Sequence, residues 1–254
     1  MKQQLDVNAP KLPRDIARRF SHVRAWVFDL DNTLYSASSD LWPKIDQRIT
    51  LFMAQLFGLD GMSSRALQKY YYQRYGTTLR GLMSEHDVTA EEFLAFVHDI
   101  DRSSLKPDHS LAQGIAALPG RKLILTNGSR EHAIRTAEKL GIHDLFEDVF
   151  DIVAADLLPK PYAETYDRFF ERHGVDPKEA AMFEDIAHNL EVPHARGMVT
   201  TLVTPRAEDQ VERERWEIAT GSEPHIDFVT DDLAAFLEAV VSDGSAPSPR
   251  VGKG

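Results

Sequence analysis

The sequence predicts an α/β fold in which a doubly wound parallel sheet carries a small helical insertion after its first strand. From residue 106 onward, short apolar segments alternate with helical stretches of ten or so residues. Strands that alternate with helices in this way form a parallel sheet with right-handed crossovers. From residue 36 to residue 105, in contrast, the pattern indicates helices and no convincing strand.

Length and composition limit the classes of function. The 254 residues allow one large domain, or a core domain with a smaller insertion. The chain has 29 Lys and Arg residues against 40 Asp and Glu residues, a net charge of -11, which argues against a nucleic-acid polymer as partner. Because it has no cysteine, disulfides, a thiolate nucleophile and cysteine-containing zinc sites are excluded.

The two ends of the chain predict little structure of their own. Residues 1–22 are polar and contain Pro10 and Pro13, so we expect an extended leader with a short helical turn at 14–20. Residues 243–254 have the composition of a disordered tail. Neither a secretory apolar core nor a run approaching ~18 apolar residues is present. We therefore expect a cytoplasmic monomer or homodimer with no membrane partner.

The first strand leads directly into two aspartates. Residues 23–28 form a nearly continuous apolar run, interrupted only by Arg24, that is typical of a strand buried on both faces. This puts Asp29 at the carboxyl end of the strand, where open α/β sheets bind ligands. Asp29 and Asp31 could converge on a divalent cation and leave one carboxylate free to attack phosphorus. The alternative is an acidic turn, since Asp and Asn favour turns.

The other predicted elements follow in order. In the insertion, helices are expected at 44–57, 63–75 and 89–101, the last beginning with Thr89 as a helix cap. In the core, strands are expected at 121–125, 149–153, 180–183, 199–203 and 225–229, and helices at 109–118, 131–140, 163–172, 189–196 and 233–241.

Polar residues at the end of the second strand form a candidate anion site. Thr126, Asn127 and Gly128 bring a hydroxyl, an amide and a small residue to the carboxyl end of the strand, just before a helix N-terminus. The alternative is an ordinary strand-to-helix loop in which Ser129 caps the helix.

Two further motifs supply a cation and more carboxylates. Lys160 lies between Pro159 and Pro161, which stiffen the backbone around it, although a lone lysine is usually a solvated surface charge. The strand at 180–183 is followed by Glu184 and Asp185, and Asn189 comes four residues later. Paired carboxylates at this edge would complete a site for magnesium, which prefers oxygen ligands.

These four motifs, in this order, resemble those of the haloacid dehalogenase (HAD) superfamily phosphatases. The resemblance implies a Rossmann-like HAD core formed by residues 23–35 and 106–242, with a cap at 36–105. It also implies an aspartyl-phosphate mechanism with a Mg²⁺ cofactor. The implied roles are Asp29 as nucleophile, Asp31 as acid and base, Thr126, Asn127 and Lys160 for phosphate, Asp29, Asp31, Glu184 and Asp185 for the metal, and Asn189 in support.

The substrate is expected to be a small phosphorylated metabolite. The sequences DNTLY, TNG, PKP and FEDIAHN look most like the pyrimidine 5′-nucleotidase branch, which releases phosphate from nucleoside 5′-monophosphates. A phosphatase for phosphoglycolate or a sugar phosphate, or a phosphomutase, would share all four motifs. A non-catalytic phospho-acceptor domain of receiver type is a further alternative, but Asp31 and the large insertion argue against it.

The insertion is predicted to be a helical cap that reads the group attached to phosphate. Within it, Thr78 and Arg80 are expected on a loop between Gly76 and Gly81, where they could hydrogen-bond a base or sugar. The nearby tyrosines Tyr71 and Tyr75 share one helix face, and we expect them to pack inside the cap.

Overall fold

The computed structural model describes residues 15–206 and 222–242, and it contains a six-stranded parallel sheet. The strand order is β3-β2-β1-β4-β5-β6, so β1 lies inside the sheet, with β2 and β3 added on one side of it and β4 to β6 on the other. All carboxyl ends therefore point to one edge. The predicted α/β class is confirmed. The strands are β1 (Ala25–Phe28), β2 (Arg121–Leu125), β3 (Asp148–Phe150), β4 (Ala180–Glu184), β5 (Val199–Val203) and β6 (Phe228–Thr230).

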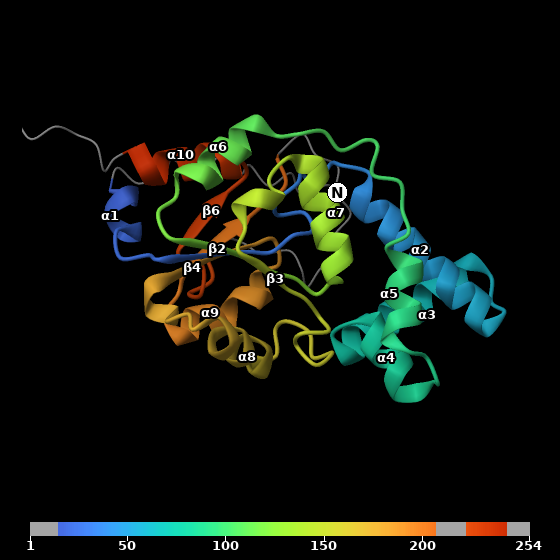
Figure 1. The fold of residues 1–254 in the computed structure, drawn as a ribbon. Coiled ribbons are helices and arrows are strands. Elements are labelled where there is room, and N and C mark those ends of the chain that lie inside the picture. Colours follow the sequence, from blue (N-terminus) through green and yellow to red (C-terminus); the bar gives the residue numbers. More distant parts are fainter. Residues whose placement is uncertain (1–14, 207–221, 243–254) are drawn as a thin grey trace, which may run out of the picture.

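Helices cover both faces of this sheet (Figure 1). On one face lie α1 (Ile16–Phe20), α6 (His109–Ala117), α7 (Arg130–Leu140) and α10 (Leu233–Ser242), and on the other α8 (Ala163–His173) and α9 (Glu191–Arg196). Strand β1 serves both layers, because Trp26 and Phe28 enter the first core and Ala25 and Val27 the second. Short 3-10 helices span His143–Leu145, Pro177–Glu179 and Ala187–Leu190. None of the helices in residues 15–206 and 222–242 has the length and hydropathy of a membrane-spanning segment.

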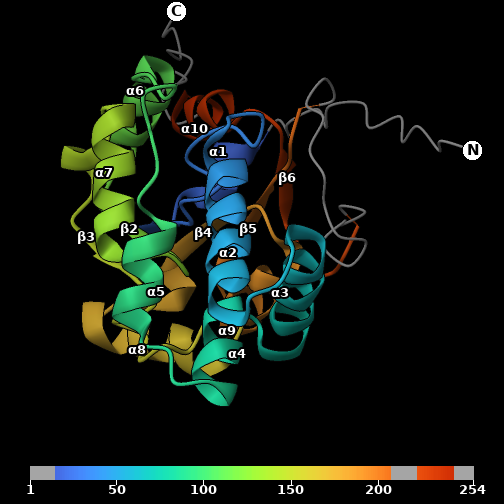
Figure 2. The same ribbon diagram turned by 90° about the vertical axis from the view of Figure 1, so that its right-hand side faces the viewer.

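A separate group of helices forms the cap, which lies to the right of the sheet in Figure 1 and faces the viewer in Figure 2. It consists of α2 (Leu41–Phe57), α3 (Gly61–Tyr75), α4 (Thr78–Glu85) and α5 (Ala90–Val97), all within the segment predicted as an insertion. Their apolar side chains build a core of their own, and Ile152, from just after β3, is buried in it. The cap therefore rests on the carboxyl edge of the sheet.

One cap helix, α4, was predicted as a loop, and that prediction is wrong. Gly76 ends α3 with a φ of 84°, a left-handed conformation that glycine adopts without strain. Thr77 then caps α4 by accepting a hydrogen bond from the Arg80 N–H at 3.2 Å. Gly81 lies against the ring of Tyr71, where a Cβ would clash. The second glycine thus serves helix packing and not loop flexibility.

The polar leader ends earlier than residue 22. Ile16 and Phe20 of α1 are buried in the core, and the ring of Phe20 lies 5.2 Å from Phe228 and 5.9 Å from Phe236. Residues from Ile16 onward are therefore part of the packed domain. The rest of the predicted leader, residues 1–14, and the predicted tail at 243–254 lie outside the described residues.

We expect Phe20→Ala to destabilise the folded protein by about 3–5 kcal/mol, the usual cost of deleting a buried aromatic ring. Urea unfolding followed by circular dichroism measures this change. Arg18→Ala, at an exposed position of the same helix, is the matched control and should change stability by less than about 0.5 kcal/mol. A Phe20 variant as stable as the wild type would mean that α1 does not belong to the core.

Candidate active site

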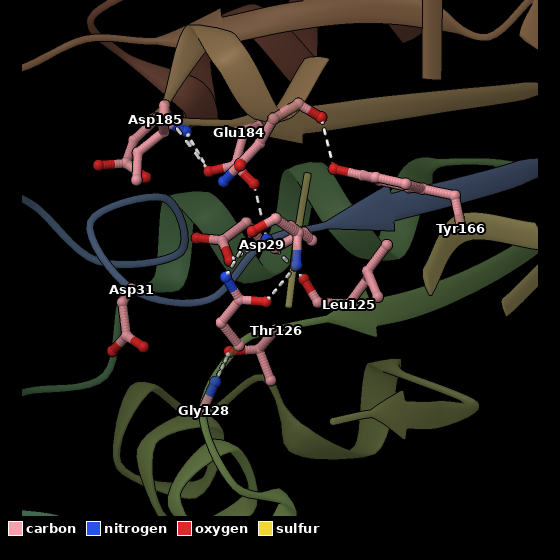
Figure 3. A network of polar contacts seen from close by, with 12 residues as sticks. Asp29, Asp31, Leu125, Thr126, Gly128, Tyr166, Glu184 and Asp185 are labelled. Carbon is pink, nitrogen blue, oxygen red and sulfur yellow. Dashed lines mark hydrogen bonds and ion pairs between the residues drawn. The ribbon is translucent and has the colours of Figure 1, made fainter. Parts of the chain in front are cut away.

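The carboxyl ends of three adjacent strands bring the predicted site residues together. Asp29 follows β1, Thr126 follows β2, and Glu184 ends β4, with Asp185 next to it. The strand register places these residues at the same height along the sheet, because Phe28 is paired with both Ile124 and Phe183. Figure 3 shows Asp29 between Glu184 and Thr126.

A buried lysine joins these strand ends. The Nζ atom of Lys160 donates to Asp29 Oδ1 at 2.6 Å, to Glu184 Oε2 at 2.6 Å and to the Leu125 carbonyl at 3.0 Å. Only 2% of Lys160 is exposed. Burial opposes its charge, but the two carboxylates outweigh that effect and raise the pKa of Lys160. The alternative of a solvated surface lysine is thereby excluded.

Asn127 positions the lysine through the backbone. Its side-chain Oδ1 accepts from the Lys160 N–H at 2.8 Å, and its Nδ2 donates to the Lys160 carbonyl at 3.3 Å. Both polar ends of the amide are therefore engaged by one residue of the facing segment. Asn127, predicted among the phosphate-binding residues, thus acts in this structure by orienting Lys160.

The site carries more negative than positive charge. One carboxylate oxygen each from Asp29, Glu184 and Asp185 lie within 4.8 Å of one another, and all three residues are buried. Burial and the charge of Glu184 raise the pKa of Asp29 to about 7, against the opposing effect of Lys160. A divalent cation would relieve this repulsion, so the donor set suits a hard metal such as magnesium.

The hydrogen bonds indicate which carboxylates could bind a metal and which one is engaged by Lys160. Glu184 uses Oε2 for Lys160, and its Oε1 accepts from the N–H groups of Asp185 at 3.1 Å and Ile186 at 3.2 Å. Both oxygens of Glu184 are thus engaged by the protein itself. Asp29 and Asp185 are the better candidates for ligands, and Glu184 is the partner that orients Lys160.

Asp31 lies in a different environment from the other three acids. Its Oδ1 accepts from the Tyr35 hydroxyl at 2.6 Å and from His132 Nε2 at 2.9 Å. Burial alone would raise the pKa of Asp31, but the contacts with His132 and Tyr35 outweigh it and lower that pKa. Sequence reasoning missed both partners. Tyr35 ends the DNTLY motif, and His132 lies in the first helical turn after TNGS. Their position next to two motifs was the one signal in the sequence that could have identified them as site residues.

The loop after β2 is shaped for a small anion. Thr126 Oγ1 accepts from the Gly128 N–H at 2.9 Å, which leaves the threonine hydroxyl proton to donate. A Cβ at Gly128 would lie 3.3 Å from both the Thr126 hydroxyl and the His132 ring, so glycine keeps this space open. Ser129 caps α7 by accepting from the His132 N–H at 3.3 Å, as its alternative role predicted.

A pocket of about 790 Å³ opens from this site between core and cap. Asn127, Lys160 and Asn189 lie along it on the core side, and its wall also includes Tyr162 and, from the cap, Tyr72, Gln73, Arg74 and Gly76. Asn189 is buried, and its carbonyl accepts from the Tyr166 hydroxyl at 2.6 Å. The predicted supporting residue therefore faces the pocket from a firmly held position.

Thr78 and Arg80 do not line this pocket. Thr78 is 6% exposed, and its hydroxyl donates to the Gln68 carbonyl at 3.4 Å, so it belongs to the interior of the cap. The guanidinium of Arg80 lies 4.3 Å from the centre of the Tyr162 ring. Tyr71 is buried in the cap core and Tyr75 packs against it, as expected.

The family of the chain follows from comparison with known proteins. The model of the haloacid dehalogenase-like hydrolases matches residues 23–195, a range that includes every site residue described above. The chain belongs to this family. The prediction of a superfamily hydrolase, and hence of an enzyme, is confirmed.

Two curated relatives are similar in sequence to this hydrolase. "Phosphate metabolism protein 8" of Saccharomyces cerevisiae is 33% identical over 157 residues, which make up 57% of this chain and 47% of that protein. The hydrolase thus spans about half the length of this relative. The phosphoglycolate phosphatase of Chromobacterium violaceum is 26% identical over 199 residues, 72% of this chain and 85% of that protein.

Solved structures share the fold of the hydrolase. A HAD phosphatase from Thermococcus onnurineus has a TM-score of 0.57 at 16% identity, covering 87% of this chain and 99% of that one. The L-2-haloacid dehalogenase from Xanthobacter autotrophicus has a TM-score of 0.53 at 19% identity, with coverage of 87% and 99%. At these identities the likeness concerns the fold alone.

We expect Asp185→Asn to weaken magnesium binding far more than Glu184→Gln, because Lys160 and two backbone N–H groups already engage both carboxylate oxygens of Glu184. The dissociation constant of the Asp185 variant should rise by roughly 10- to 100-fold, or about 1.4–2.7 kcal/mol. Isothermal titration calorimetry measures it directly. If Glu184→Gln had the larger effect, the division of roles between the two acids would be reversed.

Proposed function

We propose that this hydrolase is a magnesium-dependent phosphomonoesterase that acts through an aspartyl phosphate on Asp29, with a pyrimidine nucleoside 5′-monophosphate as substrate. The observation that carries the proposal is the contact of Asp29 with the buried ammonium of Lys160 at 2.6 Å, at the carboxyl end of β1. A carboxylate beside a fixed cation can approach a phosphate dianion, because the cation offsets their repulsion.

In the first step, an oxygen of Asp29 attacks phosphorus and the ester P–O bond breaks. The leaving oxygen takes its proton from Asp31, since an unprotonated alkoxide leaves poorly. The negative charge of the bound phosphate opposes the contacts that lower the pKa of Asp31 in the free protein, and favours its protonated form. Lys160 and the Thr126 hydroxyl stabilise the charge on the phosphoryl oxygens. The contacts of Asp31 with Tyr35 and His132 hold its carboxyl group across the site from Glu184 and Asp185.

In the second step, Asp31 accepts a proton from water, and the water oxygen attacks phosphorus to release phosphate and regenerate Asp29. A magnesium ion held by Asp29, Asp185 and the Asp31 carbonyl would neutralise charge on the phosphoryl group. Asn127 and Glu184 take no direct part in either step. Their contribution is to orient Lys160.

The presence of Asp31 favours a phosphate ester as substrate over a haloacid, the substrate class in the name of the Xanthobacter autotrophicus enzyme of the same fold. A halide leaves without a proton, whereas an alkoxide requires one, and Asp31 is placed to carry it. Against a receiver-type phospho-acceptor domain, the pocket of about 790 Å³ offers room for an organic group beyond the phosphate.

The nucleotide part of the proposal rests on the subfamily resemblance and on the pocket wall. Tyr72 could stack on a base, and Arg74, an exposed cation, could pair with a polar group of the substrate. Arg80 stays a candidate through its contact with Tyr162, whereas the buried Thr78 does not. The named relative from Chromobacterium violaceum favours phosphoglycolate as the second candidate substrate.

We expect the wild-type protein to release phosphate from p-nitrophenyl phosphate with magnesium and to stop in excess chelator. Asp29→Asn should reduce turnover by at least roughly 10⁴-fold, because no other nucleophile lies at that position. A malachite-green phosphate assay measures both, and the circular dichroism spectrum checks that the variant is folded. Full activity in chelator, or an active Asp29→Asn variant, would contradict the mechanism.

A substrate panel separates the two candidate substrates. We expect uridine 5′-monophosphate to be hydrolysed with a higher kcat/KM than phosphoglycolate, and Arg74→Ala to lower the nucleotide value by roughly 10-fold, as loss of one charge-assisted hydrogen bond predicts. Turnover of p-nitrophenyl phosphate should change little. Thr78→Ala is the matched control inside the cap and should leave the ratio of the two substrates unchanged. A preference for phosphoglycolate would favour the alternative.

A further inference from the structure

Both connections between core and cap are linked to Asp31 by hydrogen bonds, the first directly and the second through His132. The first runs from β1 to α2, and its Tyr35 donates to Asp31 Oδ1. The second runs from α5, which ends at Val97, to α6, which begins at His109. This second linker, residues 98–108, packs against the first turns of α7 through His98 and Arg102.

Arg102 is buried in the second linker and held on several sides. Only 6% of it is exposed. Its Nη2 atom donates to the His98 carbonyl at 3.2 Å, its Nη1 to the Ile100 carbonyl at 3.1 Å and its Nε to Thr136 Oγ1 at 3.4 Å. The same Nη2 lies 2.8 Å from Nδ1 of His132, a residue that is 1% exposed.

This contact determines which nitrogen of His132 carries the proton. A guanidinium has five N–H donors and no acceptor, so Nδ1 of His132 must accept and is unprotonated. The ring proton is then on Nε2, which lies 2.9 Å from Asp31 Oδ1 and donates to it. The His98 ring stacks on His132, with centroids 4.4 Å apart and planes at 11°, and fixes the plane of the imidazole.

The two donors to Asp31 meet at the same oxygen. Tyr35 and His132 both bind Oδ1, and Oδ2 points toward the loop after β2, where a Cβ at Gly128 would lie 3.7 Å from it. Oδ1 of Asp31 is thus engaged by two hydrogen bonds from the protein itself. Oδ2 is directed toward the space beside Thr126, where the scissile phosphate is expected.

We propose that His132, with its tautomer set by Arg102, is a positioning residue that holds Asp31 by Oδ1 and leaves Oδ2 to transfer the proton to the leaving group. The proposal rests on the proposed phosphatase function. The orientation of the acid then depends on the second linker being seated against α7. His132 itself neither gives nor takes the transferred proton.

The contacts from Arg102 through His132 to Asp31, here called the relay, should matter more for some leaving groups than for others. An alkyl phosphate needs proton donation from Asp31, whereas p-nitrophenolate leaves readily without it. The value of kcat/KM includes only the steps through departure of the leaving group, so hydrolysis of the aspartyl phosphate does not obscure the comparison. The probes are uridine 5′-monophosphate, or phosphoglycolate if the nucleotide is not hydrolysed, against p-nitrophenyl phosphate.

We expect His132→Leu to lower kcat/KM for the alkyl phosphate by roughly 10²-fold, the usual cost of a misplaced catalytic group, and that for p-nitrophenyl phosphate only a few-fold. His132→Gln keeps a donor for Asp31 and should recover part of the loss. Arg102→Met should act in the same direction as His132→Leu, with Arg102→Lys as its rescue, because lysine still donates to Nδ1. Arg135→Met, an exposed position of α7, is the control and should leave both substrates unchanged.

A measurement on the protein without substrate tests the relay independently of turnover. The ¹⁵N NMR signals of His132, assigned by comparison with His132→Gln, should show a protonated Nε2 and an unprotonated Nδ1 at neutral pH. The Nδ1 signal should shift in Arg102→Met. Thermal melting of each variant checks folding.

The outcomes separate this inference from the proposed function. If the wild type hydrolyses both esters but His132→Leu keeps their ratio of kcat/KM unchanged, the positioning role is refuted while the phosphatase stands. A protonated Nδ1 would refute the link to Arg102. If the wild type hydrolyses none of the esters, the proposed function fails, and with it the catalytic role of the relay, whatever tautomer the NMR signals show.

Discussion

The buried ammonium of Lys160 is the charge on which the rest of the site depends. It binds Asp29 after β1, the Leu125 carbonyl on β2 and Glu184 on β4, so it ties together the ends of three adjacent strands. A buried ion pair that loses one partner costs about 3–5 kcal/mol, because the remaining charge is left in a poorly solvating interior. The same contacts that fix Asp29, the proposed nucleophile, therefore also stabilise the carboxyl edge of the sheet.

Four acidic residues at this edge acquire different roles from their hydrogen bonds. Glu184 is satisfied by Lys160 and two backbone N–H groups, which leaves Asp29 and Asp185 as the candidate metal ligands. Asp31 is separated from them by its contacts with Tyr35 and His132. Paired carboxylates with contrasting environments are how one site can hold both a nucleophile and a proton donor.

Much of this organisation was readable in the sequence, because it is written in local patterns. The strands at Arg121–Leu125 and Val199–Val203 were predicted with their observed bounds, since buried parallel strands are short apolar runs. The position of Asp29 and Glu184 at strand ends follows from the same runs. Parallel strands bring their carboxyl ends to one edge, so the meeting of the four motifs required no knowledge of side-chain contacts.

Tertiary structure alone decided which side chains touch. The sequence by itself determined that Asp29, Lys160 and Glu184 approach one edge of the sheet. It did not determine that Lys160 and backbone N–H groups engage both carboxylate oxygens of Glu184. Gly81 signalled a loop, yet it serves the packing of α4 on Tyr71, a contact between residues ten apart on different helices. His132 meets Asp31 because α7 packs beside β1, and Arg102 meets His132 because the second linker folds back on α7. Such long-range contacts leave no periodic signal in the chain. Local chemistry thus determined where the site lies, and packing decided what each residue does there.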